Sequence, residues 1–217
     1  MSEKKLELVF LCDRSGSMGG LELDTIGGYN AMLAKQKKEE GEARVTTLLF
    51  DHDLTLLHDR IDLPGVSPLT QRTYTVGGST ALLDAMGFAM EKIAGVQRHT
   101  APGQRAGRVL FVIITDGLEN ASRRYTAPQI RAMVERYKEE YGWEFLFLGA
   151  NIDAVDAAGG LGIQADRAVN YHADSAGTRL NYDAVGKAVS AMRAGRPLSA
   201  EWRKDIDADY RGRKTGR

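Results

Sequence analysis

The stretch VFLCDRSGSMGG, residues 9–20, joins a run of apolar residues to a polar loop that is rich in glycine. The apolar part is typical of a strand that is buried on both faces of a sheet. Directly after it, Asp13, Ser15 and Ser17 place three oxygen-bearing side chains at alternate positions. In an open α/β sheet, ligands bind beyond the carboxyl ends of the strands, where the connecting loops meet. The stretch therefore predicts a central strand followed by a ligand-binding loop.

The segments that follow alternate between strand-like and helix-like patterns. Short apolar segments rich in β-branched or aromatic residues predict buried strands over residues 6–12, 44–50, 108–115 and 143–150. Amphipathic spacing predicts helices over residues 21–40, 80–94, 126–141 and about 176–194, with Thr126 as the N-cap of the third. Because strands and helices alternate, we expect an α/β fold with a mostly parallel sheet and helices on both faces.

Two segments depart from this alternation. DHDLTLLHDRIDL, residues 51–63, predicts a turn and a short strand that pairs with strand 44–50. This pairing would make one edge of the sheet antiparallel. GVQRHTAPGQRAGR, residues 95–108, has no periodicity and predicts a mobile loop.

The length of 217 residues suits one large core, and we expect a single domain over residues 1–195. Helix 176–194 would be a C-terminal addition on the outside of this domain. The remaining tail, residues 196–217, is polar and partly basic, so we expect it to be flexible.

Charge and cysteine content narrow the class of partner. Lys+Arg and Asp+Glu both number 29, so the formal net charge is zero and no overall field points to nucleic acid or a membrane surface. Cys12 is the only cysteine, which excludes an internal disulfide and fits a reducing compartment. The N-terminal MSEKKLEL is too short and charged for a signal peptide. We expect a cytoplasmic protein whose partner must be inferred from local sites.

Five oxygen-bearing side chains are expected to meet at one rim of the sheet. Asp13 and Asp116 each follow a predicted strand, Ser15 and Ser17 share the loop of Asp13, and Thr80 lies in a glycine-rich loop before a helix. Carboxylate and hydroxyl oxygens, without His or Cys, suit a hard cation such as Mg²⁺, Mn²⁺ or Ca²⁺. These side chains fill an octahedron only incompletely, which leaves a position for water or for an oxygen from another molecule.

The same residues resemble the metal-ion-dependent adhesion site (MIDAS) of von Willebrand factor A (vWA) domains. The family pattern is Asp-x-Ser-x-Ser, a distant Thr and a distant Asp, which DRSGSM at 13–18, Thr80 and TDG at 115–117 match in order. The resemblance covers about residues 6–170 and points to the intracellular type of bacteria and phages. It implies a Rossmann-like, doubly wound sheet with one short antiparallel edge strand.

The resemblance also implies a function. Ser15, Ser17 and Thr80 would coordinate the metal through their hydroxyls, with Asp13 and Asp116 acting directly or through water. In the family the sixth ligand is typically a Glu or Asp of a partner protein, and a cation with few charged ligands gains from such a carboxylate. We therefore expect a cation-dependent protein-binding module, not an enzyme, and the intracellular relatives suggest an AAA-type ATPase or a stress-response system as partner.

The residues of this site also have simpler interpretations. Ser15 and Ser17 could cap a helix that begins near residue 20, as Ser often does before an amphipathic run. Asp116 with Gly117 could form a turn, since Asp-Gly is a common turn dipeptide. Their joint order and spacing favour the metal site.

A second functional hypothesis comes from FDHDLTLL, residues 50–57, which resembles the D-x-D-x-T motif of haloacid-dehalogenase-type phosphohydrolases. In that reading Asp51 is the nucleophile, Asp53 is the general acid or base, and Mg²⁺ neutralises the phosphate. The acid expected directly after Gly149 is absent, because Ala150 stands there. A polar hairpin turn is therefore the preferred interpretation of this segment.

Overall fold

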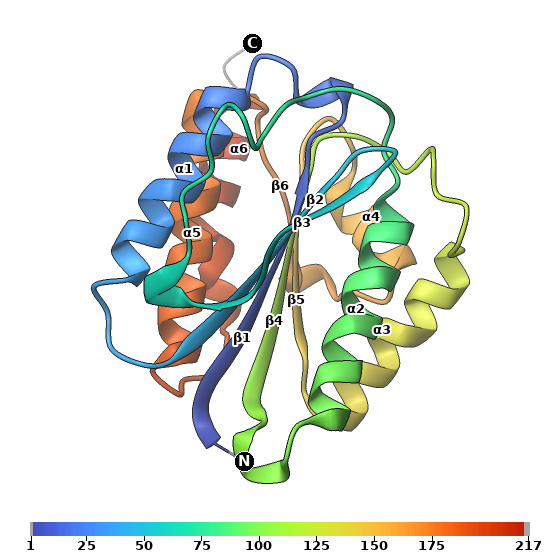
Figure 1. Ribbon diagram of the computed structural model, residues 1–217. Helices are drawn as coiled ribbons and strands as arrows, with labels where there is room; N and C mark the ends of the chain where they lie inside the picture. The colour runs from blue at the N-terminus through green and yellow to red at the C-terminus, as the bar shows by residue number, and fades with distance from the viewer. Residues whose placement is uncertain (1, 215–217) are drawn as a thin grey trace.

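Six strands form one sheet in the computed structural model, which describes residues 2–214. They are β1 (Ser2–Asp13), β2 (Ala43–Phe50), β3 (Leu54–Asp62), β4 (Ala106–Thr115), β5 (Glu144–Gly149) and β6 (Ala168–Asn170). The strand order is β3-β2-β1-β4-β5-β6, and among these strands β3 alone runs antiparallel to its neighbour. The predicted Rossmann-like α/β fold with one antiparallel edge strand is confirmed (Figure 1).

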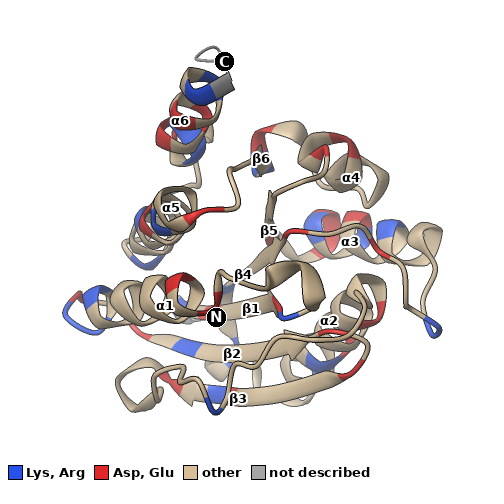
Figure 2. Ribbon diagram, turned by 90° about the horizontal axis from the view of Figure 1, so that it is seen from above, with Lys and Arg blue, Asp and Glu red and all other residues tan. Residues whose placement is uncertain are grey.

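Helices cover both faces of the sheet. They are α1 (Glu22–Gln36), α2 (Leu82–His99), α3 (Ala127–Tyr141), α4 (Ala154–Gly160), α5 (Ser175–Arg193) and α6 (Lys204–Lys214). Figure 2 shows α1, α5 and α6 on one face and α2, α3 and α4 on the other. Successive residues of a strand point to opposite faces, so Phe10 packs under the first group and Leu11 under the second. None of the helices that the structure describes is long and apolar enough to cross a bilayer.

The connection between α2 and β4 differs from the mobile loop expected over residues 95–108. Helix α2 continues to His99 and β4 already begins at Ala106, so the connection is much shorter. Hydrogen bonds from Thr100 Oγ1 to the carbonyl of Val96 and from Arg105 Nε to the carbonyl of Thr100 fix it, at 2.7 and 2.9 Å. The sequence pattern missed these contacts because they involve the backbone and not an apolar stripe.

The tail expected at residues 196–217 is helical over much of its length, as far as the structure describes it. A 3₁₀ turn at Ala200–Arg203 leads into α6, and residues 215–217 lie outside the described part of the chain. Leu198, Trp202 and Ile206 are buried against the core that α5 covers. Leu198 precedes the 3₁₀ turn, Trp202 lies within it, and Ile206 lies in the first turn of α6. The polar average of the tail conceals these buried residues.

Replacing Trp202 with alanine should lower the free energy of unfolding by about 3–5 kcal/mol, because it empties a large buried volume. The change also removes the bond of 2.9 Å from Trp202 Nε1 to the carbonyl of Asp166. Urea unfolding followed by circular dichroism measures the loss. Lys204→Ala, at an exposed position two residues further on, is the control and should change stability by less than about 0.5 kcal/mol. An unchanged midpoint in Trp202→Ala would mean that this segment does not pack in solution.

Candidate metal centre

The carboxyl ends of β1 and β4 lie side by side and carry the two predicted aspartates. The two strands are parallel neighbours, with Cys12 opposite Ile114 in the register, so Asp13 and Asp116 follow at the same edge of the sheet. This edge is the upper end of the sheet in Figure 1. Thr115 Oγ1 donates a hydrogen bond of 2.5 Å to Asp13 Oδ2 and thereby links the two strand ends.

The hydroxyl groups of the three other predicted residues face these carboxylates. Ser15 Oγ lies 3.1 Å from Ser17 Oγ, and Ser17 Oγ donates a hydrogen bond of 2.5 Å to Asp116 Oδ1. A Cβ atom on Gly117 would lie 3.1 Å from Ser17 Oγ and 3.4 Å from Thr80 Oγ1. Both hydroxyls therefore lie close together beside Gly117. The structure brings together all five residues that the sequence singled out.

Backbone contacts hold the loops of this centre in place. Gly16 N donates to the carbonyl of Gly78 at 3.0 Å, and Gly77 N donates to the carbonyl of Arg14 at 2.9 Å. These two bonds join the loop after β1 to the glycine-rich loop before α2. Gly78 has a φ of +75°, a conformation that glycine adopts without strain.

Three positioning residues were missed by the sequence reasoning. Tyr74 is buried and donates its hydroxyl to the carbonyl of Asp13 at 2.5 Å. Thr115 holds the Asp13 carboxylate as described, and Asn120 Oδ1 accepts from Thr80 N at 2.8 Å. Each of them lies far along the chain from the residue that it holds, so no local pattern could reveal these pairs.

The helix-cap interpretation of the serines does not hold. Leu21 is the residue at the N-cap of α1, and no side chain caps this helix. The short 3₁₀ turn Gly16–Met18 follows Ser15, but the Ser15 side chain forms no capping hydrogen bond with this turn. Ser15 and Ser17 are therefore free to direct their hydroxyls at the aspartates.

The two aspartates form a buried negative charge without a cationic side chain beside it. Both are almost fully buried, and burial is the main cause that raises the pKa of each carboxyl. The Asp13 charge raises the pKa of Asp116 further. Asp116 Oδ2 is buried and has no hydrogen-bond partner among the residues that the structure describes. A buried oxygen of this kind is costly unless a proton or a cation occupies its free side. The donor set and the orphan oxygen both fit a hard divalent cation.

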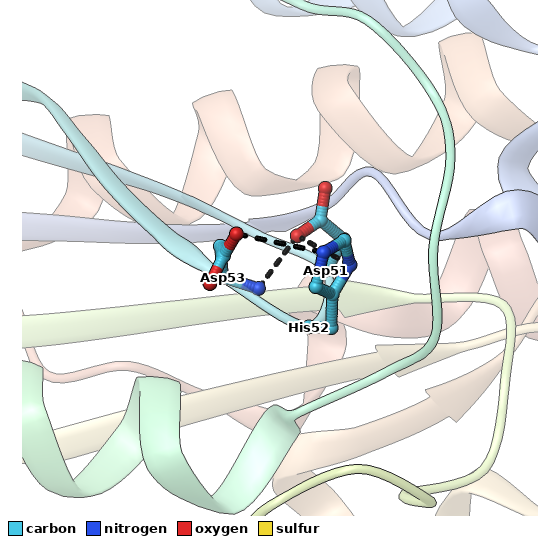
Figure 3. Close-up of side chains that lie close together, drawn as sticks. All are labelled: Asp51, His52 and Asp53. Atoms are coloured by element: carbon cyan, nitrogen blue, oxygen red, sulfur yellow. Dashed lines mark hydrogen bonds and ion pairs between the residues drawn. The ribbon is translucent and has the colours of Figure 1, made fainter.

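A second acidic group lies on the neighbouring strand end, in the turn between β2 and β3. Ligand atoms of Asp51, His52 and Asp53 lie within 4.8 Å of one another (Figure 3). His52 Nδ1 lies 3.4 Å from Asp51 Oδ1, and His52 Nε2 lies 3.5 Å from Asp53 Oδ2. Arg14 Nε forms an ion pair of 3.1 Å with Asp51 Oδ2, and Asp51 Oδ1 accepts from Asp53 N at 2.7 Å. Asp51 is thus already neutralised, so this group is the weaker candidate for a cation.

The sequence analysis did not single out His52, because the histidines of this chain have no metal-ligand spacing along the sequence. The triplet Asp51-His52-Asp53 was the available signal. His52 is also packed against Gly78, where any Cβ would collide with the imidazole ring. The turn therefore buttresses the glycine-rich loop of the candidate metal centre.

Comparisons with known proteins show the fold. No family model matches this sequence, and no curated protein matches it. In structure it is similar to the PilB minor pilin from Streptococcus sanguinis, with a TM-score of 0.58, 11% identity, and coverage of 88% of this chain and 62% of the pilin. It is also similar to the vWF domain of the type V pili tip protein Mfa5 from Porphyromonas gingivalis, with a TM-score of 0.56, 14% identity, and coverage of 87% and 96%.

A third similar structure is proximal thread matrix protein 1 from the mussel byssus, with a TM-score of 0.57, 12% identity, and coverage of 86% of this chain and 46% of that one. The chain thus spans less than two thirds of the pilin and less than half of the byssus protein. At these identities the likeness establishes a vWA-like fold.

Removing the charge of Asp116 should stabilise the metal-free protein. Because the pKa of this carboxyl is raised, the metal-free fold favours its protonated form, and stability falls as the pH rises above the ordinary range of aspartate. Asp116→Asn removes the buried charge and should therefore raise the free energy of unfolding at pH 7 in EDTA, on the order of 1 kcal/mol. Urea titrations at pH 7 and pH 4 measure the difference, which should shrink at the lower pH.

The control for this prediction is Asp53→Asn, since the Asp53 side chain is 77% exposed. We expect a change within about 0.5 kcal/mol for that variant. If Asp116→Asn destabilised the metal-free protein at pH 7, the buried charge of Asp116 would not be a cost to the metal-free fold, and this prediction would be wrong.

Proposed function

We propose that the chain is a protein-binding module that uses a divalent cation at Asp13, Ser15, Ser17, Thr80 and Asp116 to bind an acidic side chain of another protein. The observation that carries the proposal is the buried, unpartnered Asp116 Oδ2 beside three hydroxyl groups. Mg²⁺ is the cation we favour, and Mn²⁺ and Ca²⁺ have the same preference for oxygen ligands.

The chain's own residues divide the work of such a site. The hydroxyls of Ser15, Ser17 and Thr80 would supply neutral oxygens, and Asp116 would supply its free oxygen. Asp13 is held by Ser15 N at 2.7 Å and by Thr115, so it would act from a fixed position behind them. A bound cation would supply positive charge for an incoming carboxylate. Only two of the site residues, Asp13 and Asp116, are charged. The cation would therefore still attract a carboxylate from outside the site.

The similar structures support a protein as the partner, since they include a minor pilin, a pilus tip protein and a byssus matrix protein. An AAA-type ATPase or a stress-response system as partner, and a cytoplasmic location, rest on the sequence resemblance alone. Capture of a carboxylate requires no bond to be made or broken in the partner, so we propose a module that is not an enzyme.

The phosphohydrolase remains the alternative hypothesis. Its nucleophile would be Asp51. The Asp51 carboxylate already forms an ion pair with Arg14 and accepts a hydrogen bond from Asp53 N. This arrangement is that of a stable hairpin turn, which is the interpretation the sequence favoured. It supports the binding module over the hydrolase.

Stability against cation concentration tests the binding site. At about 100 times its Kd, a cation that binds only the folded protein should add roughly 2.7 kcal/mol to the free energy of unfolding. We expect Mg²⁺ or Mn²⁺ to stabilise the wild type and Asp53→Asn alike, and to have no effect on Asp116→Ala. Loss of the effect in Asp53→Asn alone would place the cation in the turn between β2 and β3. No effect on the wild type at millimolar cation would overturn the proposal.

Turnover separates the two hypotheses. With p-nitrophenyl phosphate and Mg²⁺, we expect no phosphatase activity above that of buffer. Activity that is abolished by Asp51→Asn and retained in Ser15→Ala would favour the phosphohydrolase. The Ser15 variant matters because it removes a hydroxyl of the candidate metal centre and leaves the turn at Asp51 intact.

A further inference from the structure

A cavity of about 530 Å³ lies at the other end of the sheet, away from the candidate metal centre. It is bordered by the C-terminal ends of α2 and α3 and by the first residues of β4, at the lower end of the molecule in Figure 1. Because the strands are parallel, this end is the opposite one from the rim that carries Asp13 and Asp116. The volume lies within the range of small-molecule sites.

One wall of the cavity is aromatic. Tyr137 and Trp143 are stacked, with ring centroids 4.3 Å apart and an angle of 17° between the planes. Phe111 stacks on Trp143 at 5.4 Å, which anchors the pair in the core. Tyr141 lies tilted against both rings and is 59% exposed, one of the most exposed large apolar side chains among the described residues. The wall thus offers an exposed ring that rests on a rigid stack.

The remaining wall is strongly basic. Four arginines line the cavity together with one acid, Glu140. Arg136 Nε donates to both carboxylate oxygens of Glu140, at 3.2 Å each. Arg105 and Arg108 donate to backbone carbonyls, and none of the described carboxylates forms an ion pair with Arg98, Arg105 or Arg108. The positive charge of Arg98 interacts favourably with the dipole of α2, because Arg98 lies at the C-terminal end of this helix. The Arg108 guanidinium donates to the carbonyls of Met192, Gly195 and Arg196 at the end of α5, on the other face of the sheet, so among the described residues Arg98 and Arg105 are the two unpaired cations at the cavity.

The cavity also holds an unused hydrogen-bond donor. Gln97 lines it, and the Nε2 atom of Gln97 is buried without a partner among the described residues. A buried donor of this kind normally finds an acceptor. Nε2 has almost no accessible surface, so a rotation of the Gln97 side chain would present it to an oxygen or ring nitrogen of a bound molecule.

We propose that this cavity binds a small anion that carries an aromatic ring, and that a nucleoside monophosphate is the chemical class that fits. The ring would stack beside Tyr141, the phosphate would meet the guanidinium groups, and Gln97 would donate to the base or the sugar. Guanidinium groups suit phosphate because their planar fork can donate two hydrogen bonds at once. This site needs no cation and is independent of the function proposed for the other rim.

The test uses the full chain in EDTA, so that the candidate metal centre does not contribute. The sequence has two tryptophans, and in a Trp202→Phe background Trp143 is the only fluorescent one. We expect AMP to change the Trp143 emission with a saturable curve. Adenosine, which lacks the anion, and inorganic phosphate, which lacks the ring, should each bind at least about tenfold more weakly.

Variants locate the binding. Gln97→Ala and Arg98→Gln should each weaken AMP binding at least about tenfold, and Arg98 is exposed, so its variant should fold normally. Arg123→Gln is the matched control, because Arg123 is an exposed arginine in the loop after β4, at the opposite end of the sheet. AMP that fails to bind at 10 mM, or that binds all variants equally, would overturn the proposal. Inorganic phosphate that binds as tightly as AMP would also overturn it.

Discussion

The buried carboxylate of Asp13 is the constraint on which the candidate metal centre depends. One carboxylate oxygen accepts a hydrogen bond from Ser15 N, and the other accepts one from Thr115 Oγ1. The backbone carbonyl of Asp13 accepts a third from the Tyr74 hydroxyl. These bonds tie together the end of β1, the end of β4 and the segment that leads to the glycine-rich loop. The side chain therefore organises the loops whether or not a cation is present.

The two ends of the sheet have opposite electrostatic character, although the chain has no formal net charge. Within the described residues, two buried carboxylates without a cationic partner lie at one end, and Arg98 and Arg105, which have no carboxylate partner, lie at the other. Zero net charge removes a long-range field, but it does not neutralise local sites. The absence of an overall charge was therefore a weak guide to ligands.

The sheet, its antiparallel edge and the five oxygen-bearing residues could be predicted from the sequence. Buried strands such as β4 have a dense apolar pattern, and four of the five site residues lie at or just after the end of β1 or β4, while Thr80 lies in the glycine-rich loop before α2. Other features depend on contacts between distant segments. Helix α4 has only seven residues and β6 only three, so each is too short to show a repeated hydrophobic pattern. Tyr74 and Gln97 have roles that follow from what surrounds them, and their residue types alone carry no such signal.

The C-terminal segment closes the far edge of the sheet. Arg203 donates to the carbonyls of Ala165 and Ala168, and Trp202 holds the carbonyl of Asp166, so this segment covers backbone groups beside β6. Edge strands with free backbone groups invite pairing with other chains. During synthesis on the ribosome, residues 168–170 emerge well before residues 202 and 203. Nascent chains therefore pass through a stage in which this edge is open, and its protection is completed only after the rest of the sheet can form.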